Sequence, residues 1–202
     1  MCAVRYVKPS FPEDVFVGTA AHYAKYRLPY PEALNNDLLE HAGVSGEGKL
    51  LDLACGPGRV ALPLASSFGE VWAIDLEPEM IDVGRSEAKK RGISNVKWFV
   101  GKAEELEGQP GSFELITIGE AFHRLDQEVV ARQALRWLQP GGCLAILGWN
   151  SLLGGNAPWQ RIVADISHRW KSRIASSRTR TVPEKPGSGP EHNRLVLEDF
   201  GF

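Results

Sequence analysis

The sequence predicts an α/β fold: a doubly wound, Rossmann-like, mostly parallel sheet with flanking helices. Two observations point to it. Short apolar runs alternate with helical patterns over residues 49–149, and these runs are apolar almost throughout rather than at every second position. Strands that are covered by helices on both faces have this composition, and repeated strand–helix–strand units require parallel strands with right-handed crossovers. Ligands of such sheets bind at the carboxyl ends of the strands.

Local patterns define the expected elements. Pro31 opens a helix that extends to about Ala42, and Gly43 lies where a helix stop is needed. Pro78 fits the first turn of a later helix, and Asp126 is a good N-cap. The predicted strands are residues 49–54, 71–75, 96–100, 113–118 and 143–149, and the predicted helices between them are 58–68, 78–91 and 126–138.

Two proline-containing segments interrupt the helical patterns. The Gln-Pro-Gly-Gly segment at 139–142 is expected to end the helix over 126–138. Pro63 lies inside the helix expected over 58–68. It predicts a local kink there, because proline has no amide proton and its ring clashes with the preceding turn.

Length and composition restrict the class of protein. The chain has 202 residues, of which 43% are hydrophobic and 24% charged, as in an ordinary globular domain. It has no apolar run of about 20 residues and no signal-peptide pattern. Its three cysteines form no disulfide framework and no metal-ligand spacing with the histidines, so we expect a cytoplasmic protein without a metal. A formal net charge of −2 gives no strong field, so neither a membrane nor nucleic acid is expected as a partner.

The loop after the first predicted strand is the most informative segment. Residues 50–60 read as a buried strand, a glycine-rich turn and a helix start. Gly56 and Gly58 allow the backbone to approach a ligand, and the following helix points its amide groups into the same crevice. Asp52, in a buried strand, needs a partner such as a ligand amino group. Asp75 ends the next strand, where an acid suits a bidentate contact with ribose hydroxyls.

Two nucleotide-binding motifs are disfavoured at this loop. A dinucleotide-binding turn would have glycine at positions 54, 56 and 59, whereas the chain has Ala54 and Arg59. The Arg59 side chain would intrude where a pyrophosphate must lie. A phosphate-binding P-loop is also disfavoured, because no Gly-Lys-Ser/Thr sequence follows. An oxidoreductase is therefore a weaker interpretation than another nucleoside-binding enzyme.

Several motifs in order resemble class I S-adenosylmethionine-dependent methyltransferases. LLDLACGPG is similar to the first motif of that family, and VWAIDLEPEMI to the second. The segments that resemble the adenine loop, the fourth strand and the fifth strand of the small-molecule branch called methyltransferase type 11 are GKAEEL, SFELITIGEAFHRLD and LRWLQPGGCLAILGW. The leader HYAKYRLPYP also resembles the entry of one subgroup. The likeness covers about residues 20–150.

The resemblance implies S-adenosylmethionine as cofactor, S-adenosylhomocysteine as product and a small-molecule methyl acceptor. It implies that Asp75 holds the ribose, that Leu76 and Met80 enclose the adenine, and that Arg27 faces the cofactor's carboxylate. The residues assigned to the cofactor are Tyr23, Arg27, Asp52, Ala54, Gly56, Gly58, Asp75, Leu76, Met80, Ala103, Glu104 and Gly119. The chain departs from the family at Ala54, commonly glycine, and at Lys102, commonly an acid.

The resemblance also suggests a division of the chain and the reacting groups. The expected parts are the leader and lid helix 1–45, the cofactor-binding core 46–150, and the helical extension 151–202 with a flexible loop at 176–194. His123 and Glu120 are the candidate bases, since an acidic acceptor hydroxyl needs a base within hydrogen-bond reach. A structural histidine and a cofactor-floor glutamate are the competing interpretations. We interpret Cys55 as a small buried side chain rather than a nucleophile.

Other interpretations remain open for the C-terminal part. Residues 161–194 hold eight Lys or Arg against three Asp or Glu, which indicates a solvated helix face and loop more than a patch for RNA or an anionic substrate. An RNA or protein methyltransferase, a non-catalytic cofactor-binding or scaffold protein, and a homodimer are the alternatives. The antiparallel strand pair that usually ends the family's sheet has no counterpart after residues 195–202. We therefore expect strand 143–149 to have an exposed apolar edge.

Overall fold

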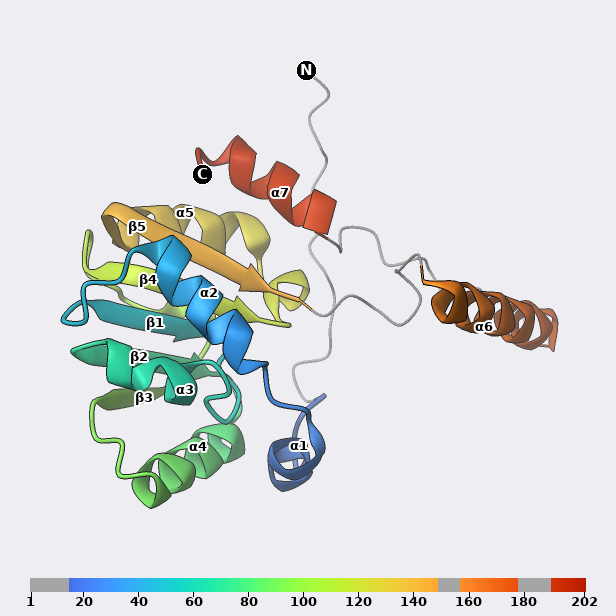
Figure 1. The fold of residues 1–202 in the computed structure, drawn as a ribbon, viewed down its shortest axis with the longest axis horizontal. Coiled ribbons are helices and arrows are strands. Elements are labelled where there is room, and N and C mark those ends of the chain that lie inside the picture. The colour runs from blue at the N-terminus through green and yellow to red at the C-terminus, as the bar shows by residue number, and fades with distance from the viewer. Residues whose placement is uncertain (1–14, 149–156, 178–189) are drawn as a thin grey trace.

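A computed structural model describes residues 15–148, 157–177 and 190–202 of the chain. Within them, five parallel strands form one sheet in the order β3-β2-β1-β4-β5 (Figure 1). The strands are β1 Lys49–Leu53, β2 Glu70–Asp75, β3 Val96–Val100, β4 Phe113–Gly119 and β5 Leu138–Leu147. The chain builds outward from β1 through β2 to β3 and then crosses to β4, so a topological switch point lies between β1 and β4. The predicted doubly wound parallel sheet is confirmed.

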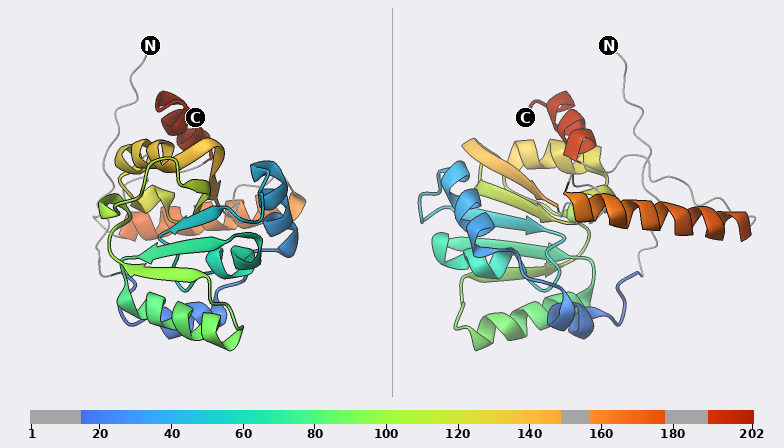
Figure 2. Two further views of the ribbon diagram at one scale, coloured as in Figure 1. Left: turned by 90° about the vertical axis from the view of Figure 1, so that its left-hand side faces the viewer. Right: turned by 45° about the vertical axis from the view of Figure 1, so that its right-hand side comes forward.

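Helices cover both faces of the sheet (Figure 2). The helices of the described residues are α1 Ala20–Tyr26, α2 Glu32–Ala42, α3 Ala61–Leu64, α4 Pro78–Lys90, α5 Gln127–Trp137, α6 Pro158–Ser177 and α7 Pro190–Asp199, with short 3-10 turns η1 Ala65–Ser67, η2 Ala103–Glu105 and η3 Phe122–Arg124. Helix α6 does not take part in this covering (Figure 1). Successive residues of a strand pack into two separate hydrophobic cores, one on each face of the sheet. Leu50 belongs to the core that includes residues of α2, α3 and α4, and Leu51 belongs to the core that includes residues of α5 and α7. This alternation is why the strands are apolar at nearly every position.

The local stop and start signals are confirmed. Helix α2 ends at Gly43, whose φ of 59° is left-handed, and Pro78 occupies the first turn of α4. The Asp126 side chain accepts a hydrogen bond from the amide of Val129 at 3.3 Å and caps α5. These signals need only neighbouring residues, which is why the sequence predicts them correctly.

Three expected boundaries are wrong. The helix expected over 58–68 is reduced to α3 and η1, and Pro63 lies inside α3, two residues before the 3-10 turn begins. Segment 139–142 lies inside β5, where the pairing of β4 shifts register between Phe113 and Leu115. The flexible loop expected at 176–194 is also too long, because residues 176–177 end α6 and residues 190–194 begin α7. The rest of that loop, 178–189, lies outside the described residues.

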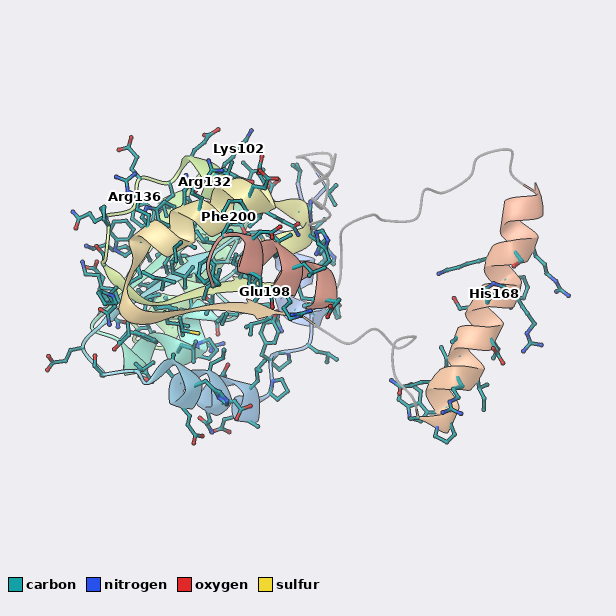
Figure 3. The ribbon with its side chains drawn as sticks, turned by 90° about the horizontal axis from the view of Figure 1, so that it is seen from above. Lys102, Arg132, Arg136, His168, Glu198 and Phe200 are labelled. Atoms are coloured by element: carbon teal, nitrogen blue, oxygen red, sulfur yellow. The ribbon has the colours of Figure 1, made fainter. Side chains whose placement is uncertain are left out.

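Helix α7 packs beside α5 next to the last strand, β5. Val196 is buried, and the Arg132 guanidinium carbon lies 5.6 Å from the centre of the Phe200 ring (Figure 3). Leu144 and Ile146 of β5 are partly buried in the same apolar cluster. The expectation of an exposed apolar edge is thus wrong for the side chains. The outer backbone of β5 pairs with no strand within the described parts of the chain.

The indole of Trp98 packs against the backbone of α4 at Gly84. A Cβ atom on Gly84 would lie 2.5 Å from two ring carbons of Trp98, which is too close for any real contact. An alanine in the middle of a helix normally stabilises it by about 0.5–1 kcal/mol relative to glycine. We expect the opposite sign here: Gly84→Ala lowers the free energy of unfolding by about 1–3 kcal/mol, because the ring must move.

Urea unfolding checks this prediction. Ser86→Ala, on the exposed side of the same helix, is the matched control and is expected to change stability by less than about 0.5 kcal/mol. A Gly84→Ala variant that is more stable than the wild-type chain would show that Trp98 does not hold this position.

Candidate functional site

A cavity of about 480 Å³ lies at the carboxyl ends of the central strands. Its walls come from the segments after β1, β2, β3 and β4, as expected for the switch point of a parallel sheet. The volume is that of a small-molecule or cofactor site. The residues that were predicted from the sequence and line the cavity are Tyr23, Ala54, Gly56, Asp75, Leu76, Met80, Ala103, Glu104, Gly119 and Glu120.

Backbone strain is concentrated at this cavity. Within the described residues, Ala54 at 53° and Glu120 at 56° are the non-glycine residues with positive φ, and both line the cavity. A left-handed conformation costs an L-amino acid on the order of 1–2 kcal/mol, and such strain is typically retained at functional sites. Gly56 has a similar φ of 55°, and a Cβ atom there would meet only the Tyr23 ring, at 4.0 Å. The loop after β1 thus leaves space over its backbone.

Asp75 joins two of the loops around the cavity. Its Oδ2 accepts a hydrogen bond from the Gly56 amide at 2.7 Å, and its Oδ1 accepts one from the Glu77 amide at 3.0 Å. Burial raises the pKa of Asp75 above its usual value, and these amides and the Arg124 charge partly oppose the shift. A carboxylate has about four acceptor sites, so two remain for a ligand with paired hydroxyl groups.

The partners of Asp52 are found within the protein. Its Oδ1 accepts a 2.8 Å hydrogen bond from the Thr117 hydroxyl, and its Oδ2 accepts a 3.1 Å bond from the Ala61 amide at the start of α3. The side chain is only 1% exposed and does not line the cavity. Protein donors therefore supply the partner that this carboxylate needs, and its contact with a ligand amino group stays a prediction. Burial raises the pKa of Asp52 to about 7 despite these bonds.

This shift predicts a pH-dependent stability. A carboxyl group whose pKa is higher in the folded state contributes stability that is complete below its unfolded pKa of about 4 and is lost as the pH rises through about 7. A neutral side-chain amide at this position could bond the same two partners, because the Thr117 hydroxyl can also accept. We therefore expect Asp52→Asn to gain roughly 2–4 kcal/mol relative to the wild-type chain between pH 4 and pH 8.

Urea unfolding at several pH values measures this difference. Asp82→Asn is the control, since the Asp82 carboxyl is exposed on α4, with 73% of its side chain accessible. Its stability should follow the wild-type pH profile. If the free energies of unfolding of Asp52→Asn and of the wild-type chain changed in parallel with pH, Asp52 would not change its protonation on folding in this range.

Aromatic and cationic side chains form one part of the cavity lining. The Phe16 and Tyr23 rings meet edge to face at 5.9 Å, and the Arg124 guanidinium carbon lies 4.4 Å from the centre of the Phe16 ring. Arg27 Nη2 lies 3.6 Å from Glu120 Oε2, which joins the segment after α1 to the end of β4. Phe16 and Arg124 were not predicted from the sequence. The local pattern around each of them gives no signal for the site.

Another wall of the cavity is apolar. Met80 is buried, Leu76 is 37% exposed, and Ala103 lies beside them. Leu125 and Val129, at the entry to α5, complete this wall and were also not predicted. Glu104 lines the cavity too, and its Oε1 accepts a 2.8 Å hydrogen bond from the Asp126 amide. This part of the cavity can hold a flat, weakly polar ring between aliphatic side chains.

Four predicted site residues do not line this cavity. Arg27 lines a neighbouring cavity of about 350 Å³ together with Lys25, Arg59 and Arg91. Gly58 serves packing: its φ is 78°, and a Cβ atom there would lie 2.7 Å from the Trp98 ring. The others are Asp52 and the half-buried His123 of η3. The roles assigned to all the site residues remain predictions.

Two further features bear on the chemistry. Burial raises the pKa of the Cys55 thiol well above its usual value, so it is protonated at neutral pH, in line with its interpretation as a packed side chain. In the described part of the chain, no group of three or more His, Cys, Asp or Glu residues could hold a metal ion.

Comparison with known families decides the class of this domain. The methyltransferase domain family matches residues 50–142, from β1 into β5. Residues 50–142 are a methyltransferase domain. The chain is similar to the demethylmenaquinone methyltransferase of Geobacillus kaustophilus, with 30% identity over 141 residues. The match covers 66% of this chain and 60% of that protein, so the chain spans less than two thirds of this relative.

Solved structures show the same fold around the methyltransferase domain. An S-adenosylmethionine-dependent methyltransferase from Aquifex aeolicus superposes with a TM-score of 0.61 at 19% identity, over 90% of this chain and 87% of the other. Phosphoethanolamine N-methyltransferase 2 from Haemonchus contortus, in complex with phosphomonomethylethanolamine and S-adenosylhomocysteine, superposes with a TM-score of 0.62 at 22% identity, over 91% and 41%. None of the helices in the described residues has the length and apolarity needed to cross a bilayer.

Proposed function

We propose that the chain binds S-adenosylmethionine in the 480 Å³ cavity and transfers its methyl group to a small-molecule acceptor. The observation that carries the proposal is the Asp75 carboxylate at the carboxyl end of β2 in a methyltransferase domain, with two acceptor sites left for ribose hydroxyls. The names of the similar proteins support a small acceptor: one is a demethylmenaquinone methyltransferase, and another is bound to phosphomonomethylethanolamine. The scattered cysteines support a cytoplasmic location.

The residues around the cavity fit this cofactor. The positive φ angles of Ala54 and Gly56 leave the loop backbone open toward the cavity, where an amino-acid moiety can approach. Leu76, Met80 and Ala103 offer an apolar slot for the adenine, beside Asp75 for the ribose. When bound, S-adenosylmethionine supplies a methyl group that its sulfonium already activates. The protein is left with alignment, which can contribute on the order of 7–11 kcal/mol.

We assign the proton acceptor of this reaction to Glu120. Its carboxylate lies on the cavity wall at the end of β4, and Arg27 holds it from the lid side at 3.6 Å. The backbone of Glu120 has a positive φ of 56°, and strain of this kind is typically retained at functional sites. An acceptor hydroxyl or activated carbon acid would give its proton to a Glu120 oxygen as the methyl group is transferred. His123 lies off the cavity wall and is the weaker candidate.

Calorimetry with S-adenosylhomocysteine and, separately, NAD tests the proposal. We expect the wild-type chain to bind the first and not the second, because the loop after β1 has Ala54 and Arg59 where a dinucleotide-binding turn has glycine. Mass spectrometry then measures methyl transfer to the reduced, hydroquinone form of a demethylated naphthoquinone and to phosphoethanolamine. Binding of NAD alone, or of neither ligand by a folded chain, would overturn the assignment of the cofactor.

A further inference from the structure

Helix α6 stands away from the sheet and its covering helices (Figures 1 and 3). Its large apolar side chains are consequently exposed: Trp159 by 52%, Ile162 by 59%, Ile166 by 45% and Trp170 by 59%. The sequence predicted a helical extension here, and an amphipathic helix ordinarily packs its apolar face on a core. The structure leaves the face uncovered.

The exposed side chains form one continuous stripe. The spacings of three, four and four residues from Trp159 to Trp170 place them on the same side of a helix, along about 16 Å of its axis. A contiguous apolar surface of this kind marks a binding site for a protein or a lipid surface. The stripe is too short to cross a bilayer, so it can only lie on a surface.

The charges of α6 indicate which surface. The helix carries Arg161, Arg169, Lys171 and Arg173 against the single acid Asp165, in a chain with a formal net charge of −2. Positive charge is therefore concentrated on this helix. The Arg173 guanidinium carbon lies 5.8 Å from the centre of the Trp170 ring, so a cation borders the apolar stripe directly.

We propose that α6 binds the surface of an anionic phospholipid bilayer, with its axis parallel to the membrane plane. The isoleucines enter the acyl boundary and the two indoles lie at the headgroup level, where an amphipathic ring is most stable. The arginines and Lys171 extend toward lipid phosphates while their aliphatic stems cover the edge of the stripe. This inference replaces the expectation of no membrane partner, which was based on the net charge of the whole chain.

Two other occupants fit the observations less well. A second copy of α6 would bring two helices of equal positive charge together, and this repulsion disfavours pairing. An RNA strand would satisfy the cations but leaves the isoleucines without a role, because its binding depends on phosphate contacts. An anionic bilayer satisfies the apolar stripe and the charges together.

Sedimentation of the full chain with vesicles tests the proposal. We expect binding to vesicles of phosphatidylglycerol and phosphatidylcholine in a 1:3 ratio, and much weaker binding to phosphatidylcholine alone. Ile162→Ala with Ile166→Ala keeps helix propensity and is expected to lower the partition coefficient at least about tenfold. Leu135→Ala, at a 45% exposed apolar residue of α5, is the matched control and should bind like the wild-type chain.

A second measurement separates the alternatives. Tryptophan emission of the wild-type chain should shift to shorter wavelength on addition of the anionic vesicles, and binding should weaken with salt. No partition of a folded chain would overturn the proposal. A dimer that the isoleucine double variant dissociates would overturn it too, as would binding of a single-stranded RNA without binding of vesicles. The proposal would also fail if Trp159 and Trp170 were already shielded from water before lipid is added.

Discussion

Asp75→Ala should weaken the binding of S-adenosylhomocysteine by at least about 100-fold. The substitution removes the two free acceptor sites that we assign to the ribose hydroxyls, and hydrogen bonds to a charged group contribute about 1.5–3 kcal/mol each. It also removes the acceptor for the Gly56 and Glu77 amides, so the loops after β1 and β2 lose their common contact. Isothermal calorimetry measures the change in affinity.

Controls separate a lost contact from a lost fold. Asp82→Ala removes an exposed carboxylate from α4 and should leave the affinity unchanged. Asp75→Asn retains one acceptor oxygen and should bind with intermediate affinity. Thermal unfolding of each variant shows whether the domain remains folded. Wild-type affinity in a folded Asp75→Ala variant would mean that the ribose lies elsewhere and that the carboxylate only joins the two loops.

Glu120→Gln should lower kcat for methyl transfer by about 100- to 1,000-fold, with the affinity for S-adenosylhomocysteine within about threefold of wild type. Glutamine has the same shape and the same tolerance of the positive φ at this position, so the substitution changes chiefly the charge and the proton affinity. The side-chain amide of glutamine cannot take up the proton that the methyl acceptor releases. Steady-state kinetics beside calorimetry therefore distinguish loss of the base from loss of the cofactor.

Two further variants make the Glu120 prediction specific. Arg27→Met removes the 3.6 Å ion pair with Glu120 and should reduce kcat less than Glu120→Gln does, because the carboxylate remains. His123→Gln should change kcat by less than about threefold, since His123 does not line the cavity. The reverse order, with His123→Gln inactive and Glu120→Gln active, would assign the proton transfer to the histidine. Equal activity of all variants would show that the reaction needs no protein base.

Much of the fold could be predicted from the sequence because the signals are local. Leu50 and Leu51 face opposite sides of the sheet and are both apolar, so the strand is recognised as covered on both faces. The caps at Gly43 and Asp126 depend on backbone groups within a few residues. The acid at position 75, at the end of a strand, likewise marks the site without any tertiary information.

The errors arose where one segment depends on a distant one. The helix after β1 begins only at Ala61, whose amide is bonded to Asp52, and Asp52 is in turn bonded to Thr117, 65 residues further along the chain. No pattern within the first loop shows that this carboxylate is already satisfied. The same applies to Phe16 and Arg124, which are far apart in the sequence and come together at the cavity.

The sequence by itself determined the order of strands and helices, the class of the domain and the acid that we assign to the ribose. Periodicity, capping and motif spacing act over a few residues and survive in a one-dimensional string. Only the tertiary structure decided that Glu120 lies on the cavity wall, that His123 and Asp52 do not, and that the apolar face of α6 is uncovered. Those facts depend on which distant surfaces pack together, because burial and hydrogen-bond partners are properties of the folded chain.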